Sequence, residues 1–309
     1  MRIIYMGTPD ISVPALLRLI EYHDVVAVVT QPDRPKGRGR QMQYSPVKEE
    51  AVRHGIPVLQ PVKARDPEFV AEIAALEPDL IVVMAFGQIL KRDLLELPRY
   101  GCINIHASLL PMYRGASPIN QVIIDGCEET GVTTMMMDEG LDTGDILLKR
   151  SVKIGNDDTA GSLHDKLAAL GADVIIDTIA ALEAGTLTRT PQQGESSYAG
   201  MITKEMGEID WTQPAQVIER RMRGLDPWPG AYTEIEGRRL KIFSASIVED
   251  YSDAAPGTVL KAHKDTLTVK CGSGALTLGR VQAEGKKAMT AGEYMRGNAV
   301  TEGTVLGKS

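Results

Sequence analysis

The sequence has 309 residues, 43% of them hydrophobic and 24% charged, which is the composition of a folded globular protein long enough for two domains. Its net charge of −7 argues against binding nucleic acid through overall charge, and no apolar stretch approaches the ~18 residues that cross a membrane. The three cysteines are scattered and the N-terminus lacks a signal-peptide pattern, so we expect a cytoplasmic protein without a disulfide framework or a zinc site.

Residues 1–189 alternate short β-rich runs with helical patterns, which predicts a Rossmann-like α/β domain around a mostly parallel sheet. Two helix starts carry a capping residue followed by proline, at Ser45-Pro46 and Asp66-Pro67, and a long helix is predicted from Thr159 to about Ala184. The predicted strands of this domain are Arg2–Met6, Val25–Thr30, Pro57–Gln60, Leu80–Met84, Cys102–His106, Thr133–Met137 and Ile146–Arg150.

Residues 190–206 are polar and without sustained periodicity, which is typical of a linker. Residues 207–309 then change character and predict a small antiparallel, OB-like β-barrel of about five strands. This second domain carries 14 Lys and Arg against 13 Asp and Glu, so the excess acid lies in the first two thirds of the chain. The predicted strands are Gly230–Glu236, Arg239–Val248, Thr258–Ala262, Thr266–Lys270 and Ala275–Val281.

The turn after the first predicted strand, Gly7-Thr8-Pro9-Asp10, lacks the GxGxxG pattern of dinucleotide-binding folds. No GxxxxGK[ST] motif occurs elsewhere. A bound dinucleotide or nucleoside triphosphate is therefore not expected, and the fold class alone decides nothing about function.

The strand Cys102–His106 ends in alternating apolar and polar residues, so Asn104 and His106 project from the same face. Open α/β sheets bind ligands beyond the carboxyl ends of their strands, where this strand delivers both groups. An amide and an imidazole there can donate hydrogen bonds to one developing oxyanion. The alternative is that Asn104 caps a turn and His106 is a core histidine.

The loop Asp138–Asp145 holds four carboxylates and two glycines in eight residues, between two predicted strands. Its spacing is not that of an EF-hand, and a plain surface turn is an open alternative. A carboxylate of this loop could instead orient His106. A hydrolase triad with Ser108 is disfavoured, because no G-x-S-x-G motif exists and Ser108 lies only two residues from His106.

Residues Gln31–Tyr44 form a predicted loop rich in glycine and proline, with one acid, Asp33. Long loops in compact domains are usually functional, and arginine suits phosphates and base edges, although a solvated basic loop remains possible. A second basic feature, Arg220–Arg223, could contact an RNA backbone together with Arg238, Arg239 and Lys241. The basic residues of the loop are Arg34, Lys36, Arg38 and Arg40.

Three motifs together resemble the folate-dependent formyltransferase family: His106-Ala-Ser-Leu-Leu-Pro111, Tyr113-Arg-Gly115 and Leu141-Asp-Thr-Gly-Asp145. Asn104 completes the Asn-x-His…Asp signature of that family. Within the family, the chain is similar over essentially its whole length to the members that formylate methionyl initiator tRNA. The segments that carry this closer similarity are Ile3–Pro14, Thr30–Arg40, Asp210-Trp211 and Gly224–Ala231.

The resemblance implies that 10-formyltetrahydrofolate is the formyl donor, that the α-amino group of methionyl initiator tRNA is the acceptor, and that no metal is used. It implies that Asn104 and His106 stabilise the oxyanion and that Asp142 orients His106 and helps to relay the amine proton. It also implies a folate site lined by Ser108, Leu109, Leu110 and Pro111, with Val82–Gln88 enclosing the pterin. For the two leucines, simple packing is an open alternative. Residues 207–309 would bind tRNA, and in the basic loop Arg38 would probe the terminal base pair.

Three alternative functions remain open. A formyltransferase acting on a nucleotide-sugar amine would share Asn104, His106 and Asp142 but have no use for the basic loop. A hydrolase that releases formate would replace the amine by water. A non-enzymatic RNA-binding module would keep the signature only as scaffold. Charge and composition are compatible with a monomer.

Overall fold

A computed structural model of the chain describes residues 1–36 and 41–307, and it divides into two compact units. Unit 1 comprises residues 1–118, 129–153 and 164–199, and unit 2 comprises residues 119–128, 154–163 and 200–309. Within the described ranges, no helix is both long enough and apolar enough to cross a membrane. Arg38 and Arg40 lie outside the described residues.

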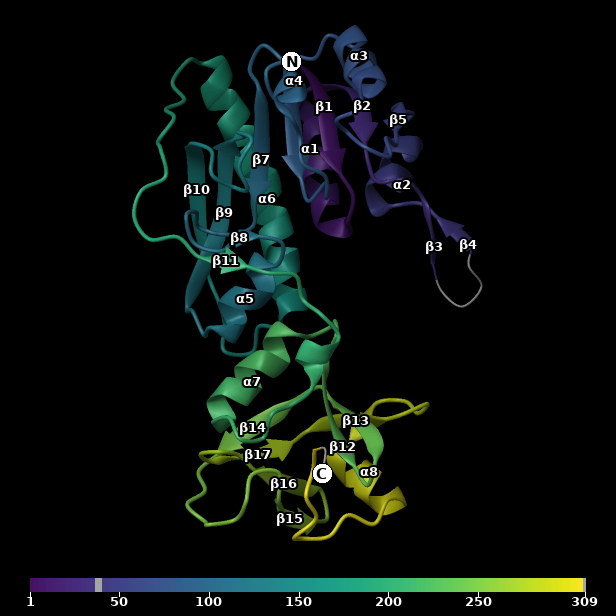
Figure 1. Ribbon diagram of the computed structural model, residues 1–309, viewed down its shortest axis with the longest axis vertical. Helices are drawn as coiled ribbons and strands as arrows, with labels where there is room; N and C mark the ends of the chain where they lie inside the picture. The colour runs from purple at the N-terminus through teal and green to yellow at the C-terminus, as the bar shows by residue number, and fades with distance from the viewer. Residues whose placement is uncertain (37–40, 308–309) are drawn as a thin grey trace. The chain divides into compact units, whose positions relative to one another are not determined.

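Unit 1 is built on a seven-stranded sheet in the order β10-β9-β7-β6-β1-β2-β5 (Figure 1). The four pairings from β7 to β5 are parallel, and β9 and β10 add an antiparallel hairpin, so the predicted mostly parallel sheet is confirmed. The strands are β1 (Arg2–Gly7), β2 (Asp24–Val29), β5 (Val58–Leu59), β6 (Leu80–Met84), β7 (Cys102–His106), β9 (Glu129–Met136) and β10 (Ile146–Lys153).

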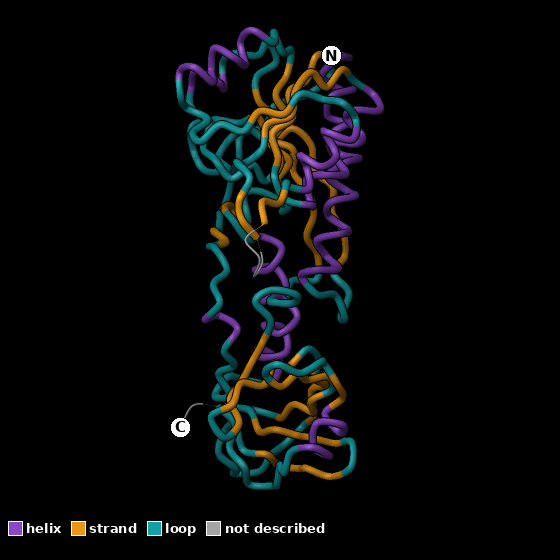
Figure 2. The backbone as a smooth tube through the Cα atoms, turned by 90° about the vertical axis from the view of Figure 1, so that its right-hand side faces the viewer, coloured by secondary structure: helices purple, strands orange, loops and turns teal. Residues whose placement is uncertain are grey.

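Two helices of unit 1 begin at the predicted pairs of a capping residue and a proline, although only Ser45 makes a side-chain capping hydrogen bond. The Ser45 side chain accepts a hydrogen bond from the Lys48 backbone at the start of α2, and Asp66 precedes α3, each helix with proline in its first turn. In Figure 2, helices lie alongside the strands of the sheet. The helices are η1 (Asp10–Ser12), α1 (Val13–Tyr22), α2 (Pro46–Arg53), α3 (Pro67–Ala75), α4 (Arg92–Leu95), α5 (Pro118–Ile124) and α6 (Ala160–Glu183). Apart from Pro118, α5 belongs to unit 2, and α6 begins in unit 2 and continues in unit 1.

The two faces of β7 are distinguished by what packs on them. A Cβ added to Gly171 of α6 would lie 3.1 Å from Ile105, so this glycine lets α6 approach one face closely. Cys102 instead belongs to a buried apolar cluster that includes Ile73 of α3 and Leu94 of α4. Since side chains alternate along a strand, Asn104 and His106 point away from α6.

The segment Gln31–Tyr44 differs from the predicted loop, because its described part forms a hairpin. β3 (Arg34–Lys36) pairs antiparallel with β4 (Gln41–Gln43). Lys36 and Gln41 form the last pair before the residues that are not described. The glycine and proline content of this segment hides the strand pairing from sequence analysis. The pairing fixes the direction in which the stem of the segment runs.

Unit 2 contains two four-stranded antiparallel sheets, β12-β13-β18-β19 and β14-β17-β16-β15. Two predicted strands, Arg239–Val248 and Ala275–Val281, are each divided between these sheets, and the breaks meet where the Gly279 amide donates to the Ser244 carbonyl. The strands are β12 (Ala231–Ile235), β13 (Arg238–Ile242), β14 (Ala245–Val248), β15 (Val259–His263), β16 (Thr266–Lys270), β17 (Ala275–Leu278), β18 (Arg280–Ala283) and β19 (Met289–Thr290).

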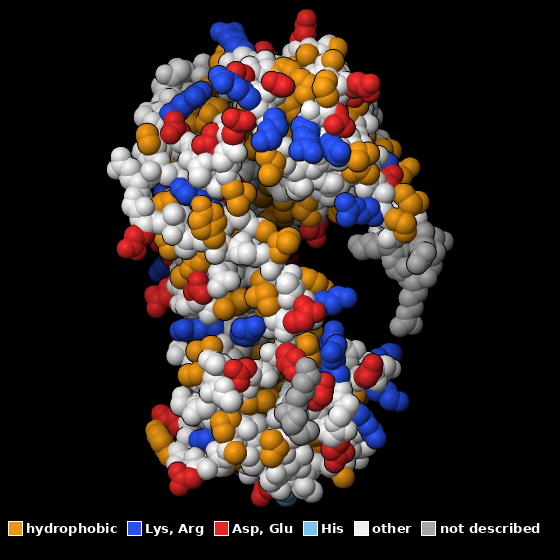
Figure 3. Space-filling view, in the orientation of Figure 1, with side chains coloured by type: hydrophobic (Ala, Val, Ile, Leu, Met, Phe, Trp, Pro, Cys, Tyr) orange, Lys and Arg blue, Asp and Glu red, His pale blue; other side chains and the backbone are white. Residues whose placement is uncertain are grey.

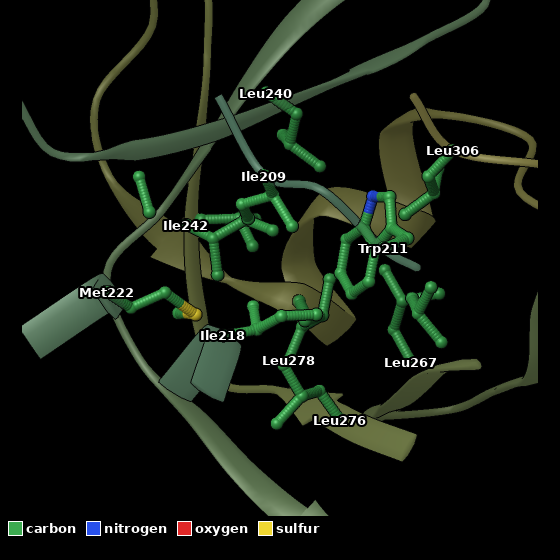
Figure 4. Packing of buried hydrophobic residues seen from close by; sticks show 14 of the residues in the cluster. Ile209, Trp211, Ile218, Met222, Leu240, Ile242, Leu267, Leu276, Leu278 and Leu306 are labelled. Carbon is green, nitrogen blue, oxygen red and sulfur yellow. The ribbon is translucent and has the colours of Figure 1, made fainter. Parts of the chain in front are cut away.

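The two sheets of unit 2 enclose one apolar cluster, which is consistent with a small barrel. Trp211 lies in it among aliphatic side chains (Figure 4), and its ring nitrogen donates to the Thr233 hydroxyl at 2.9 Å. Helices not predicted from the sequence flank the strands: η2 (Glu205–Gly207), α7 (Ala215–Gly224) and α8 (Ala291–Gly297).

The arginines of α7 are largely engaged within unit 2. Arg221 donates to the Met206 carbonyl, and Arg223 binds both the Glu219 carboxylate and the Asp158 carbonyl. This segment therefore offers an RNA backbone less free charge than its sequence suggests.

Candidate active site

Asn104 and His106 lie at the carboxyl end of β7, between β6 and β9. Their exposed fractions are 9% and 6%, so both side chains are held in place by packing. Among the described residues, the Asn104 side-chain amide has no hydrogen-bond partner. Its amide atoms are not among the fully buried atoms that lack a partner, so they remain accessible and are free to bind a ligand.

The His106 ring has its two nitrogens in different environments. Nε2 lies 2.9 Å from the Tyr113 carbonyl oxygen, which can only accept, so Nε2 carries the hydrogen. Nδ1 lies 3.7 Å from Asp142 Oδ2, which is too long for a direct hydrogen bond. The neutral ring therefore presents its lone pair on the side of the carboxylate.

Asp142 stands in the β9–β10 connection with a positive φ of 52°, a conformation that costs non-glycine residues free energy. Its Oδ2 accepts a hydrogen bond from the Gly115 amide at 2.8 Å, which ties it to the loop after β7. Close packing fixes the same loop at Gly144, where an added Cβ would stand 1.7 Å from the Met136 carbonyl oxygen. The predicted acidic loop thus brings Asp142, rather than its other carboxylates, to His106.

The segment predicted to line a folate site divides into buried and accessible residues. Ser108 and Leu110 are fully buried, and the Ser108 hydroxyl donates to the Met112 carbonyl. The Thr133 hydroxyl bonds the Ser108 carbonyl and the Leu110 amide, which fixes the path of the loop. Leu109 and Pro111 are half-buried and present apolar surface.

The loop after β6, within the predicted pterin segment, lies next to the end of β7 in the sheet. Ala85 and Gly87 are exposed and have φ values of 48° and 83°. The Phe86 carbonyl between them accepts hydrogen bonds from the Thr8 and Gln31 side chains, which hold the backbone of this loop in place.

The chain returns to this site after α6. β11 (Tyr198–Ala199) pairs with β8 (Arg114–Gly115), and the Ser197 hydroxyl accepts from the Tyr113 amide at 2.9 Å. Gln192 donates to the carbonyls of Asp142 and Gly144, both at 2.8 Å. Part of the segment predicted as a linker thus belongs to unit 1 and contacts both site loops.

The stem of the basic hairpin is anchored by a polar cluster. Lys48 Nζ lies 2.5 Å from Asp33 Oδ2 and 2.7 Å from the Gln60 side-chain oxygen, and it stands over the Tyr44 ring. The Lys48 hydrogen bond lowers the pKa of the Asp33 carboxyl. Arg34 is exposed, and the backbone of Lys36 continues β3.

The arrangement supplies a hydrogen-bond donor, a lone pair and a carboxylate at one sheet edge. The Asn104 amide can stabilise an oxyanion, while His106 Nδ1 and Asp142 can accept protons from an amine. Among the residues that the structure describes, no cluster of His, Cys, Asp and Glu could hold a metal ion.

Sequence reasoning missed Gln192, Thr133 and the role of the Gly115 amide. A glutamine in a polar run and a threonine in a strand carry no local signal, because their partners lie far away in the sequence. The Tyr113-Arg-Gly115 motif marks the position of the amide but not the bond it donates.

Two family models match the chain: formyl transferase over residues 1–179, and formyl transferase, C-terminal domain, over residues 201–299. The methionyl-tRNA formyltransferase of Caldanaerobacter subterraneus subsp. tengcongensis is 54% identical over 99% of this chain and 100% of its own length. That of Geobacter metallireducens is 55% identical over 99% of this chain and 98% of its own.

Among solved structures, the N-formyltransferase of Helicobacter canadensis, crystallised with folinic acid and dTDP-3-aminofucose, has a similar fold. Its TM-score is 0.66 at 20% identity, and the match covers 92% of this chain and 99% of that one.

Proposed function

The chain belongs to the formyl transferase family, and from that membership we propose that it transfers the formyl group of 10-formyltetrahydrofolate to the α-amino group of methionyl initiator tRNA. The observation that carries this proposal is the similarity to methionyl-tRNA formyltransferases, at more than half identity over full length. The site geometry agrees with it, because acyl transfer to an amine needs an oxyanion donor and a proton acceptor.

Two accessible surfaces of unit 1 support the folate site. The exposed backbone at Ala85 and Gly87 offers polar groups to the pterin ring, and Leu109 and Pro111 offer apolar contact. Ser108 and Leu110 are buried, so we assign them to the shape of the loop rather than to direct contact.

Formyl transfer begins when the amine attacks the formyl carbon and creates a tetrahedral oxyanion. Asn104 donates to this oxygen, because its accessible amide has no partner among the described residues. The Tyr113 carbonyl holds the Nε2 hydrogen of His106, so Nδ1 accepts the proton that the amine loses. The oxyanion then collapses, the bond between the formyl carbon and N10 breaks, and N10 of the released tetrahydrofolate takes up that proton. Asp142 stabilises the resulting imidazolium across the 3.7 Å gap. This assigns His106 as a base rather than the oxyanion donor expected from the sequence.

Recognition of tRNA is assigned to the basic hairpin and to residues 207–309. Arg34 and Lys36 stand on β3, and Arg38 and Arg40 follow in the sequence, where they would probe the acceptor end. Figure 3 shows basic and acidic side chains interspersed over the visible face, so the proposed contact with RNA rests on these local features.

We propose that the protein acts as a monomer, in which the three reacting side chains meet within unit 1. An acceptor that is charged tRNA supports action in the cytoplasm. We propose residues 1–189 as the catalytic region and 207–309 as the tRNA-binding region, joined by residues 190–206, of which 190–199 belong to unit 1.

The decisive experiment compares charged initiator tRNA, charged elongator tRNA, free methionine and a nucleotide-linked amino sugar as formyl acceptors. We expect transfer from 10-formyltetrahydrofolate to initiator methionyl-tRNA at a rate well above the other three. Equal transfer to the amino sugar, or formate release without any RNA, would refute the proposal.

A further inference from the structure

Gln192 stands where three parts of unit 1 meet: the β9–β10 connection, the loop after β7 and the segment that follows α6. It lies within a run that the sequence predicts as linker, and its side chain is half-buried. The four hydrogen bonds that it makes use every donor and acceptor position of its amide.

The hydrogen-bonding partners of the Gln192 side chain fix the orientation of its amide. The carbonyl oxygens of Asp142 and Gly144 can only accept, so they face the Gln192 nitrogen at 2.8 Å each. The Arg114 guanidinium can only donate, and its Nε and Nη2 lie 3.2 and 2.7 Å from the Gln192 oxygen. The side chain therefore bridges two loops in one way only.

Both bridged loops act on the reacting groups. The first carries Asp142 itself, held at a φ of 52° that needs support from its surroundings. The second provides the Tyr113 carbonyl that fixes the His106 ring and the Gly115 amide that binds Asp142. Displacement of either loop would change the distance between His106 and Asp142.

We propose that Gln192 is a positioning residue, which locks the His106–Asp142 pair through the Arg114 guanidinium and the carbonyls of Asp142 and Gly144. This inference rests on the proposed function only in the change of kcat that it predicts. The lock itself is a property of the fold.

The test is Gln192→Glu, which keeps length and shape but replaces the donating nitrogen by an oxygen. The new carboxylate still accepts from Arg114 but repels the two carbonyl oxygens, so the Asp142 loop must shift. A displacement of about 1 Å at a reacting group can cost ~100-fold in rate, so we expect kcat to fall by 10- to 100-fold. KM for the folate donor should change little, because Leu109 and Ala85 lie outside the bridge.

The matched control is Gln193→Glu, which adds the same charge one residue further along. Gln193 is exposed and, among the described residues, its side chain makes no hydrogen bond, so kcat should be unchanged. If Gln192→Glu does not fold, Gln192→Met removes the donor without adding charge and should lower kcat in the same sense. A kcat within twofold of the control in both variants would overturn the proposal.

A second readout needs no substrate. In protein labelled with ¹⁵N-histidine, the ring resonances of His106, assigned with His106→Asn, should move in Gln192→Glu and stay in Gln193→Glu. Unmoved resonances would overturn the lock whatever the activity. Conversely, a wild-type protein that formylates no tRNA would refute the proposed function, while this measurement would still decide on Gln192.

Discussion

At the scale of single residues, Asn104 is the side chain whose surroundings best define a role. It is nine-tenths buried, and its amide has no partner among the described residues. We expect Asn104→Ala to lower kcat by about 10²- to 10³-fold, because loss of one oxyanion donor costs that much in other enzymes. Single-turnover formylation with saturating donor measures the chemical step directly.

The control for this prediction is Asn156→Ala. Asn156 is exposed in a turn, and its side chain makes no hydrogen bond within the described ranges, so turnover should be unchanged. Folate affinity, followed by fluorescence titration, should be nearly equal in both variants. Normal turnover of Asn104→Ala would remove this residue from the mechanism.

The sequence predicts which residues meet at the site but not how they bond. Alternation along β7 is sufficient to place Asn104 and His106 together at a strand end. The direction of the His106 ring depends on the Tyr113 carbonyl, whose position follows from a backbone conformation with φ of 59°. Such a conformation in a non-glycine residue is set by tertiary contacts and has no signature in the residue type.

At the scale of elements, the β9–β10 connection depends on the close approach at Gly144. A methyl group there would meet the Met136 carbonyl of strand β9, and backbone in a sheet cannot move aside. We expect Gly144→Ala to lower the free energy of unfolding by about 1–3 kcal/mol or more and to lower kcat, because the loop must shift. Urea unfolding and steady-state kinetics measure the two effects.

Gly140→Ala is the comparison for this change in the same loop. Its added Cβ would meet the Thr143 hydroxyl, which is the end of a rotatable side chain. Its effect on both quantities should therefore be clearly smaller. Equal losses in the two variants would contradict the argument from backbone contact.

The stem of the basic hairpin makes a prediction that depends on pH. Lys48→Met removes the partner of Asp33 and loosens β3 and β4, so KM for tRNA should rise while KM for the folate donor stays constant. The folded state lowers the pKa of Asp33, so the pair stabilises fully above the unfolded value of about 3.9 and progressively less as pH falls below it.

Thermal unfolding between pH 7 and pH 3 tests the hairpin argument. The difference in Tm between wild type and Lys48→Met should be constant near neutrality and shrink toward pH 3. A difference that grows with acid would show that Asp33 is not the responsible partner.

The boundaries of a strand were predictable where the whole run of β-forming residues belongs to one sheet. β6 and β7 have the predicted bounds, because both are buried along their whole length; β6 is continuously apolar, and β7 alternates apolar and polar residues towards its end. In unit 2 the runs at 239–248 and 275–281 each cross from one sheet to the other near Gly279, and local periodicity does not report which partner a strand pairs with. The capping box of α8, formed by Thr290 and Glu293, could have predicted this helix from the sequence. It was missed because the surrounding sequence is typical of strands.

At the scale of the whole molecule, a net charge of −7 must be reconciled with a polyanionic substrate. Local cations have to supply the attraction, and each phosphate contact releases counterions. We expect Arg34→Ala to raise KM for tRNA and to reduce the slope of log KM against log salt by about 1. Kinetics between 50 and 200 mM KCl would measure this slope.

Arg99→Ala is the charge-matched control, because Arg99 lies before β7, at the sheet edge opposite Asn104 and His106. Its removal changes net charge equally but should leave the slope unaltered. Equal slopes for wild type and Arg34→Ala would exclude Arg34 from phosphate contact.

The bridge made by Gln192 also has a consequence for the order in which a nascent chain matures. When residue 153 has been synthesised, all seven strands of the sheet and the three reacting side chains are present in the chain, yet Gln192 and β11 are still to be added. At 5–20 residues per second the bridging segment follows some seconds later. A newly made polypeptide would thus acquire its sheet first and the competent geometry of its site last. A fragment that ends at residue 189 would contain Asn104, His106 and Asp142 without the bridge that positions them, whereas one that ends at residue 199 would include the bridge.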